Sequence, residues 1–245
     1  MKNDGDLEWT RLLAKCWERQ SCVLPRTRGL LSPRAGFELI CDLGQLWRKS
    51  SHPPFIGHFA TGRGETEVHP RVFPTRSDET FFRHAKRVSG ALGTNDFLLY
   101  VRGFAEHAPW LQERANAKLE LLREGGASWD HLELELYIGR YDWTPIGIHR
   151  ESCGNLHQTI VGGKDMLVWP QNALRAQTDR PECARNGATR LGALDAGLLS
   201  RKDCTYHRAA QGETIYFPSQ HWHVGMSPDL SVALDLALFG VGRRS

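Results

Sequence analysis

The segment from Gly147 to Pro170, GIHRESCGNLHQTIVGGKDMLVWP, places a histidine and an acid two residues apart beside apolar, strand-like runs. Successive side chains of an extended strand point to opposite faces, so His149 and Glu151 project from one side and Arg150 from the other. An imidazole and a carboxylate on one face suit a borderline divalent metal such as iron, zinc, copper or nickel. Two ligands do not complete a site, so the pattern calls for a third.

The third ligand is expected from the segment Gly212–Gly225, GETIYFPSQHWHVG, which ends in two histidines. His221 and His223 lie on the same face of an extended strand, so alternation alone does not choose between them. Either would complete a facial triad of two histidines and one carboxylate, the arrangement that non-haem Fe(II) oxygenases use. The alternative is coincidence: the chain has 11 histidines, and a short H-x-E motif by itself is a weak signal.

Residues 126–245 read mainly as short strands. The Gly162-Gly163 pair predicts a tight hairpin turn, because glycine adopts positive φ without steric cost. Several short strands separated by turns predict a β-sandwich or barrel. The expected strands are HLELELYIG, the two arms around Gly162-Gly163, TYHRAA, ETIYFPS, HWHVGM and SVALDLALF.

Residues 1–125 read as mainly helical. Amphipathic spacing predicts helices around Leu7–Trp17, in DETFFRHAKRVSGAL and in PWLQERANAKLELLRE, and NDFLLYVRGF predicts a strand between them. The stretch 51–77 is rich in Pro, Gly, His and Arg and predicts irregular structure around short strands. We therefore expect one domain over 1–245, in which a helix-rich buttress precedes the β core.

The composition favours a cytoplasmic protein without a nucleic-acid or membrane partner. The formal net charge is only +3, and the six cysteines form no C-x-x-C pair. The start MKNDGDLEWTRLL is charged rather than apolar, and no run of about eighteen apolar residues follows it.

Taken together, the two segments resemble a known family. IHRESCGNLHQTIVGGKDMLVWP resembles the metal-binding core of JmjC-type Fe(II)/2-oxoglutarate oxygenases, and GETIYFPSQHWHVG resembles their later strand, usually G-D-x-x-Y-x-P-x-x-W-W-H. The specific likeness spans roughly residues 130–240. It implies a double-stranded β-helix, the cupin or JmjC jelly roll. It also implies that His149, Glu151 and His223 bind iron, with Glu where many members have Asp.

The resemblance also assigns a co-substrate site. Trp222-His223 matches the family's Trp-His, which favours His223 over His221, although Gln220-His221 stands where aromatics are usual. Lys164 matches the basic residue that binds the far carboxylate of 2-oxoglutarate, and a buried carboxylate does need such a cation. Without the resemblance, the position of Lys164 after Gly162-Gly163 would predict a solvent-exposed lysine at the tip of a hairpin. Two further sets of residues are expected nearby: Asn155 at the iron-proximal end of the co-substrate, and Thr144 or Tyr137 as the hydroxyl assisting Lys164.

The implied function is hydroxylation of a C–H bond in a peptide or protein side chain, including peptide natural-product tailoring, with molecular oxygen and 2-oxoglutarate consumed. The alternatives are hydroxylation of a free amino acid or small molecule, N-demethylation, a cupin enzyme that uses no 2-oxoglutarate, and a cupin binding module. A rival metal grouping joins His149 to His157 and Cys153, but the tight spacing of structural zinc sites is absent. The oligomeric state, a homodimer included, is left open.

Overall fold

The computed structural model describes residues 4–26, 29–61, 64–66, 68–174, 182–183, 189–190 and 204–243. The helices are α1 (Asp4–Cys16), α2 (Pro33–Lys49), α3 (Phe81–Leu92) and α4 (Pro109–Glu124), with short 3-10 turns at Pro70–Val72, Arg76–Asp78 and Ala105–His107. The strands are β1 (Cys22–Leu24), β2 (Ile56–Thr61), β3 (Gly64–Thr66), β4 (Phe97–Arg102), β5 (Ala127–Ser128), β6 (His131–Tyr141), β7 (His149–Arg150), β8 (Gly154–Val161), β9 (Gly163–Trp169), β10 (Glu182–Cys183), β11 (Thr189–Arg190), β12 (Thr205–Ala210), β13 (Thr214–Phe217), β14 (Trp222–Phe239) and β15 (Gly242–Arg243).

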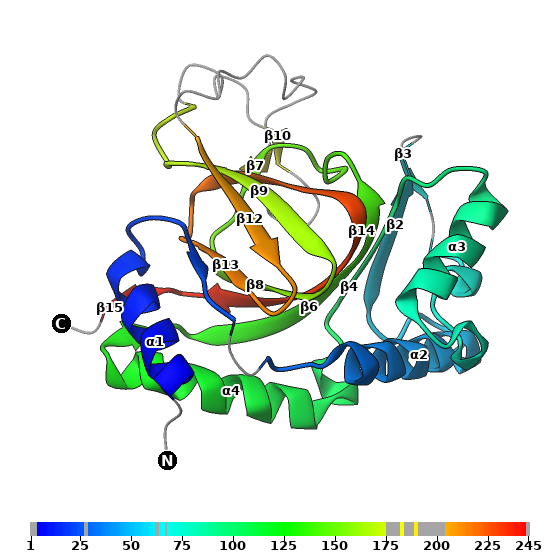
Figure 1. Ribbon diagram of the computed structural model, residues 1–245, viewed down its shortest axis with the longest axis horizontal. Helices are drawn as coiled ribbons and strands as arrows, with labels where there is room; N and C mark the ends of the chain where they lie inside the picture. Colours follow the sequence, from blue (N-terminus) through cyan, green and yellow to red (C-terminus); the bar gives the residue numbers. More distant parts are fainter. Residues whose placement is uncertain are drawn as a thin grey trace.

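Strand β14 joins the two sheets of the fold (Figure 1). Its first residues pair with β9 and β7, and the residues after Ser231 pair with β6 and β8. The pairing register with β6 shifts between Ser227 and Ser231, around Pro228, which has no N–H to donate to a ladder. The bend at this irregularity lets one strand enter both the larger sheet, β1-β13-β8-β14-β6-β4-β2-β3, and the smaller sheet, β12-β9-β14-β7-β11-β10.

The expected hairpin at Gly162-Gly163 is wrong. Strand β8 pairs with β13 and β14, whereas β9 pairs with β12 and β14, so the two arms belong to different sheets. Only Gly162 takes a positive φ, of 73°, and a Cβ there would lie 2.0 Å from the Leu230 carbonyl oxygen. The glycine therefore turns the chain from the larger sheet into the smaller one, at a close approach to β14.

The first half contains the expected helices and more strand than expected. Helices α1, α3 and α4 and strand β4 fall where the sequence predicts them. However, β1 extends one edge of the larger sheet, and β4, β2 and β3 extend the other beyond β6. The residues before β6 thus contribute directly to the larger sheet.

Helices α1, α2 and α4 run along the outer side of the larger sheet (Figure 1). Helix α4 buries Leu111, Ala115, Leu119 and Leu122, which recur at three- and four-residue spacing on one face. Helix α2 begins with Ser32, whose hydroxyl accepts a hydrogen bond from Ala35 N, followed by a proline in the first turn. No helix of the described ranges is long and apolar enough to cross a membrane.

The inner faces of the two sheets enclose a cavity, which lies apart from the main apolar core between the helices and the larger sheet. The main apolar cluster packs the helices against the larger sheet, and two smaller clusters pack on the smaller sheet. The cavity is lined by a mixture of polar and apolar side chains from both sheets, including Met166 and Phe217 of one smaller cluster. Polar side chains from the middle of the chain can therefore lie close together in a space shielded from solvent.

Candidate functional site

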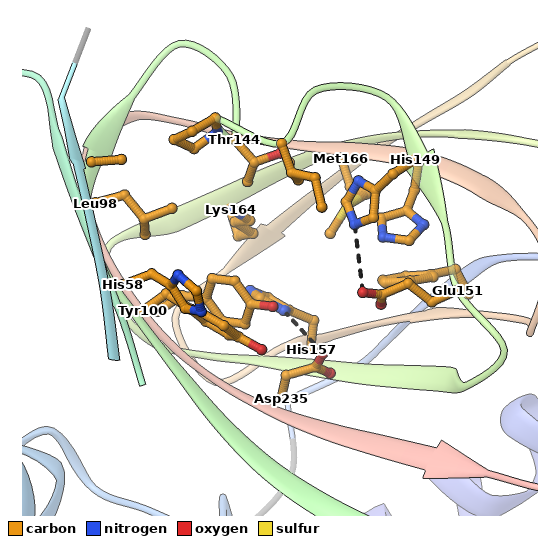
Figure 2. A pocket seen from close by; sticks show the side chains of 17 residues that line it. His58, Leu98, Tyr100, Thr144, His149, Glu151, His157, Lys164, Met166 and Asp235 are labelled. Carbon is orange, nitrogen blue, oxygen red and sulfur yellow. Dashed lines mark ion pairs between the residues drawn. The ribbon is translucent and has the colours of Figure 1, made fainter. Parts of the chain in front are cut away.

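The cavity between the sheets measures about 110 Å³ and gathers most of the residues that the sequence singles out (Figure 2). The lining includes Thr144, Tyr137, Lys164 and all three expected metal ligands. Strands β2 and β4, from the first half of the chain, add His58, Ala60, Leu98 and Tyr100. The strands before β6 therefore form part of the site.

His149, Glu151 and His223 lie together at one end of this cavity. His149 and His223 are direct partners across the β7–β14 pair, and Glu151 follows β7 on the same face as His149. The two imidazole rings lie 4.2 Å apart between centroids, and His149 Nε2 lies 3.8 Å from Glu151 Oε1. One potential ligand atom from each residue falls within 4.8 Å of the others, and this is the only such cluster among the described residues.

The backbone fixes which nitrogen of each histidine faces the cluster. His149 Nδ1 lies 2.9 Å from the Gly147 carbonyl, and His223 Nδ1 lies 3.1 Å from the His221 carbonyl. A carbonyl oxygen only accepts, so each Nδ1 carries the proton and donates it. Each Nε2 is left with a free lone pair, which is how protein histidines are held when they bind a metal.

The electrostatics of the cluster also fit a divalent cation. Burial, together with the nearby His149, lowers the pKa of His223 well below its usual range, so its imidazole is neutral. Two imidazoles and one carboxylate form a donor set typical of Fe(II). The residues present therefore fit a metal ion.

The chain around the triad is held by specific contacts. Gln220 N donates to the Glu151 carbonyl at 2.8 Å, which ties the loop before β14 to the end of β7. Glu18, which follows α1, accepts hydrogen bonds from Ser219 N at 3.2 Å, from Ser219 Oγ at 2.5 Å and from the Tyr216 hydroxyl at 3.0 Å. The loop that leads to His223 is thus anchored on both sides.

His221 does not join the cluster. Its Nδ1 donates to the Ser219 carbonyl at 3.2 Å, and the residue lines no part of the cavity. Alternation places His221 and His223 on one face, but only His223 lies opposite His149 in the pairing register. The pairing register, which the local sequence does not reveal, therefore distinguishes His223 from His221.

Lys164 is fully buried in the cavity wall, with 1% of its surface exposed. Its ammonium donates to the Tyr141 hydroxyl and, at 3.4 Å, to Ser227 Oγ. No carboxylate of a described residue forms an ion pair with it. Burying an ammonium without a counter-ion costs free energy, so the site suits an anionic ligand. The alternative interpretation, in which Lys164 lies in solvent at the tip of a hairpin, is excluded by its burial.

The hydroxyl groups around Lys164 differ in part from those expected. Thr144 lies beside it: a Cβ added at Gly225 would lie 2.8 Å from Lys164 Nζ and 3.4 Å from Thr144 Cγ2. The buried Thr144 Oγ1 has no hydrogen-bond partner in the described structure, so a ligand oxygen could bond both groups. Tyr141 and Ser227 were missed by the sequence reasoning; Tyr141 shares a face of β6 with Tyr137, and that parity was the available signal.

Tyr137 lines the cavity but directs its hydroxyl away from Lys164. The hydroxyl donates to Glu135 Oε2 at 2.9 Å. Its ring packs at 4.7 Å from Tyr100 and at 5.0 Å from His157, between centroids. Tyr137 therefore contributes an aromatic wall, and its hydroxyl is already engaged.

Asn155 does not line the cavity. It is buried, and its amide contacts Cys153, with Nδ2 3.4 Å from the Cys153 carbonyl. The Cys153 thiol in turn lies 3.6 Å from Glu151 Oε2. Asn155 thus lies behind the triad and contacts Glu151 only through Cys153.

The rival grouping of His149 with His157 and Cys153 does not form. The described residues hold no metal-type cluster that includes either of them. His157 lies on the larger sheet and lines the cavity, and Cys153 is a buried free thiol. Burial raises the pKa of the Cys153 thiol, which keeps it protonated.

Comparison with known proteins identifies the fold. No protein-family model matches the chain, and no curated protein matches it in sequence. A structure of Escherichia coli YcfD matches 94% of this chain and 52% of that chain, with a TM-score of 0.53 and 12% identity. YcfD, described as a ribosomal oxygenase, also matches in complex with cobalt and succinic acid (TM-score 0.51, 14% identity, 94% and 51% covered) and with cobalt and 2-oxoglutarate (TM-score 0.52, 15% identity, 94% and 51% covered).

The chain spans about half the length of the YcfD chains that it matches. At this low identity the likeness establishes the arrangement of strands rather than a shared activity. The expected fold class, a mainly β protein with flanking helices built on a double-stranded β-helix, is confirmed, and the chain has the fold of the cupin/JmjC-type oxygenases.

Proposed function

We propose that this protein is an Fe(II)- and 2-oxoglutarate-dependent oxygenase that hydroxylates a C–H bond. One observation carries the proposal: a His-Glu-His cluster and a buried lysine without a carboxylate partner among the described residues line the same cavity of about 110 Å³. A cupin binding module would need neither group, and a cupin enzyme without 2-oxoglutarate would not need the lysine. The binding of cobalt with 2-oxoglutarate or succinic acid by YcfD, which has the same fold, supports the proposal.

Each residue has a defined part in this proposal. His149, Glu151 and His223 would hold the iron, and Lys164 with Thr144 would hold the distal carboxylate of 2-oxoglutarate. Bound iron supplies the redox chemistry: one O₂ and one 2-oxoglutarate are consumed, one oxygen atom enters the C–H bond as a hydroxyl, and succinate and CO₂ are released. The protein contributes orientation and a space sheltered from water.

The preferred substrate is a peptide or protein side chain, because YcfD is described as a ribosomal oxygenase. A free amino acid or small molecule, and an N-methyl group whose hydroxylation leads to demethylation, use the same chemistry. We propose a single functional unit over residues 1–245, since strands from both halves line the cavity.

Anaerobic titration of Fe(II) and 2-oxoglutarate tests the proposal, read by the visible charge-transfer band of the iron chelate. The band is expected in the wild type, absent in His149→Ala, and retained in His52→Ala, which removes an exposed histidine. In Lys164→Met, iron should still bind, while the 2-oxoglutarate concentration needed for the band rises. Stoichiometric iron binding without any band in the wild type would exclude the 2-oxoglutarate assignment.

A further inference from the structure

The carboxylate of Glu151 is engaged on two sides. Its Oε1 lies 3.8 Å from His149 Nε2, the nitrogen that faces the cluster, and Figure 2 shows the carboxylate directed at that ring. Its Oε2 lies on the side of Cys153, whose thiol donates to it at 3.6 Å. One oxygen of Glu151 therefore faces His149, and the other is bonded by the thiol.

This bond gives Glu151 the support that the backbone gives to the other two ligands. The rings of His149 and His223 are each held by a backbone carbonyl. No other group of a described residue donates a hydrogen bond to the Glu151 carboxylate. The Glu151 side chain has three rotatable bonds and is 27% exposed, so ordering it without the thiol would cost rotamer entropy. Carboxylates that bind metals are commonly held by a hydrogen bond from a second residue, and the thiol is in the place of that residue.

Asn155 holds the thiol in turn. Its Nδ2 lies 3.4 Å from the Cys153 carbonyl oxygen and 3.5 Å from Cys153 Sγ, so the amide donates toward both atoms. Sγ also lies 3.7 Å from Asn155 Oδ1. The thiol has a single proton, and a charged carboxylate is a stronger acceptor than an amide oxygen, so the proton is directed at Glu151. The three side chains form a chain of bonds from Asn155 through Cys153 to Glu151.

Packing in an apolar core does not account for Cys153. Cys16 and Cys41 are also buried cysteines, and both belong to the main apolar cluster, whereas Cys153 belongs to none of the three clusters. Among the described residues its hydrogen-bonding partners are Glu151 and Asn155. Cys153 and Cys41 are equally buried, each with 3% of its surface exposed. A difference between variants of the two therefore reports on these partners rather than on the loss of a buried thiol.

We infer that Cys153 is a positioning residue for the metal site and that Asn155 acts on the site through it. The thiol fixes the rotamer of Glu151, so that Oε1 is presented to the metal before the metal binds. The inference rests on the metal-binding part of the proposed function, because it concerns the iron ligand Glu151. It gives Asn155 a part other than contact with the co-substrate.

Calorimetric titration of Co(II) into the metal-free protein tests the inference. Loss of a residue that holds a metal ligand weakens metal binding by about ten- to hundred-fold, and a thiol is a weak donor, so Cys153→Ala should weaken Co(II) binding by about ten-fold. Cys153→Ser keeps a donor and should stay within about three-fold of the wild type. Cys41→Ala, which removes an equally buried thiol, should bind Co(II) as the wild type does.

Asn155→Ala distinguishes a chain of bonds from two independent effects. If Asn155 acts through Cys153, Asn155→Ala should weaken Co(II) binding in the wild-type protein and cause no further loss in Cys153→Ala. Two fold-losses that multiply in the double variant would contradict the inference, because they would assign Asn155 an effect of its own.

The infrared S–H stretching band gives a second reading that does not depend on the alanine variants. Co(II) bound to Glu151 draws negative charge from Oε2, so the bond from the thiol weakens and the Cys153 band should move to higher wavenumber. Cys153→Ser should lack this shift, which assigns the band. Absence of a shift in metal-loaded wild type would overturn the inference, and so would equal Co(II) affinities of Cys153→Ala and Cys41→Ala.

Failure of the inference and failure of the proposed function give different results. If Co(II) binds and neither its affinity nor the S–H band responds to Cys153, only the positioning role fails. If Co(II) affinity depends on Cys153 but 2-oxoglutarate does not bind to the loaded protein, the proposed function fails and the positioning role stands. A wild-type protein that binds no Co(II) would overturn both.

Discussion

The ammonium of Lys164 occupies the space that a side chain at position 225 would fill. A Cβ built on Gly225 would lie 2.8 Å from Lys164 Nζ and 3.1 Å from Cε. Lys164 is in β9 and Gly225 is in β14, and these strands pair with Gly225 opposite Met166. The absence of a side chain on β14 therefore allows the lysine to reach Tyr141 across the cavity.

Gly225→Ala is consequently expected to displace the ammonium. Overpacking of this kind costs about 1–3 kcal/mol of stability, and the lost charge-assisted bond should weaken 2-oxoglutarate binding by about ten-fold or more. Metal affinity should stay near the wild-type value because the triad is not touched. Calorimetric titration of 2-oxoglutarate into Co(II)-loaded protein measures the effect.

The control for this variant is Gly90→Ala. Gly90 lies in α3, and a Cβ there would meet nothing within 4 Å. Alanine should raise stability by about 0.5–1 kcal/mol and leave 2-oxoglutarate binding unchanged. If Gly225→Ala bound 2-oxoglutarate as well as Gly90→Ala does, Lys164 would not be a carboxylate ligand.

Replacement of Thr144 by valine should separate ligand binding from stability. The buried Thr144 Oγ1 has no partner among the described residues, so its removal should stabilise the ligand-free protein by about 1 kcal/mol. The same change should weaken 2-oxoglutarate binding, whereas Thr144→Ser, which keeps the hydroxyl, should preserve it. Urea unfolding and 2-oxoglutarate titration of both variants provide the comparison; loss of stability without loss of affinity in Thr144→Val would assign the hydroxyl a purely structural role.

The sequence predicts the parts of this molecule that depend on local periodicity. Alternation in β6 and helical spacing in α3 and α4 are local signals, and they predict these elements correctly, whereas the two expected strands HWHVGM and SVALDLALF form one continuous strand, β14. The expectation that His149 and Glu151 share a face likewise depends only on the alternation of a strand. The ligand roles themselves stay predictions that binding experiments must test.

The sequence does not reveal features that depend on pairing between distant strands. Tyr141, Ser227 and Lys164 meet because β6, β14 and β9 converge, and Gly162 separates two sheets instead of closing a hairpin. The same holds for Asp235 beside His157, which are 78 positions apart in the chain. Register is set by tertiary packing, so these partners could be found only in the fold.

Glu18→Gln should loosen the loop that positions His223. Glu18 accepts three hydrogen bonds from Tyr216 and Ser219, two at Oε1 and one at Oε2. An amide is uncharged and its nitrogen only donates, so the charge-assisted bond from Ser219 Oγ would become a weaker neutral bond in which the hydroxyl accepts. We expect a loss of about 1–3 kcal/mol in stability and several-fold weaker Co(II) binding. Gln20→Ala, an exposed change two residues away, is the control. Unchanged Co(II) affinity in a destabilised Glu18→Gln would show that the anchor supports the fold but not the triad.

Stability is expected to fall as the pH drops from about 6.5 to about 4, in part because of His84. Its imidazole is fully buried and bonds the Val72 carbonyl at 2.8 Å, and burial lowers its pKa to about 4. Between the two pKa values the unfolded chain binds a proton that the folded protein does not, so stability rises with pH in this window and is lost on acidification. At pH 5 the loss should be on the order of 2 kcal/mol relative to pH 7.5. Urea unfolding at both pH values should show a smaller difference in His84→Gln, which keeps a donor for Val72, and the wild-type difference in His52→Ala; equal pH dependence in all three proteins would contradict the assignment.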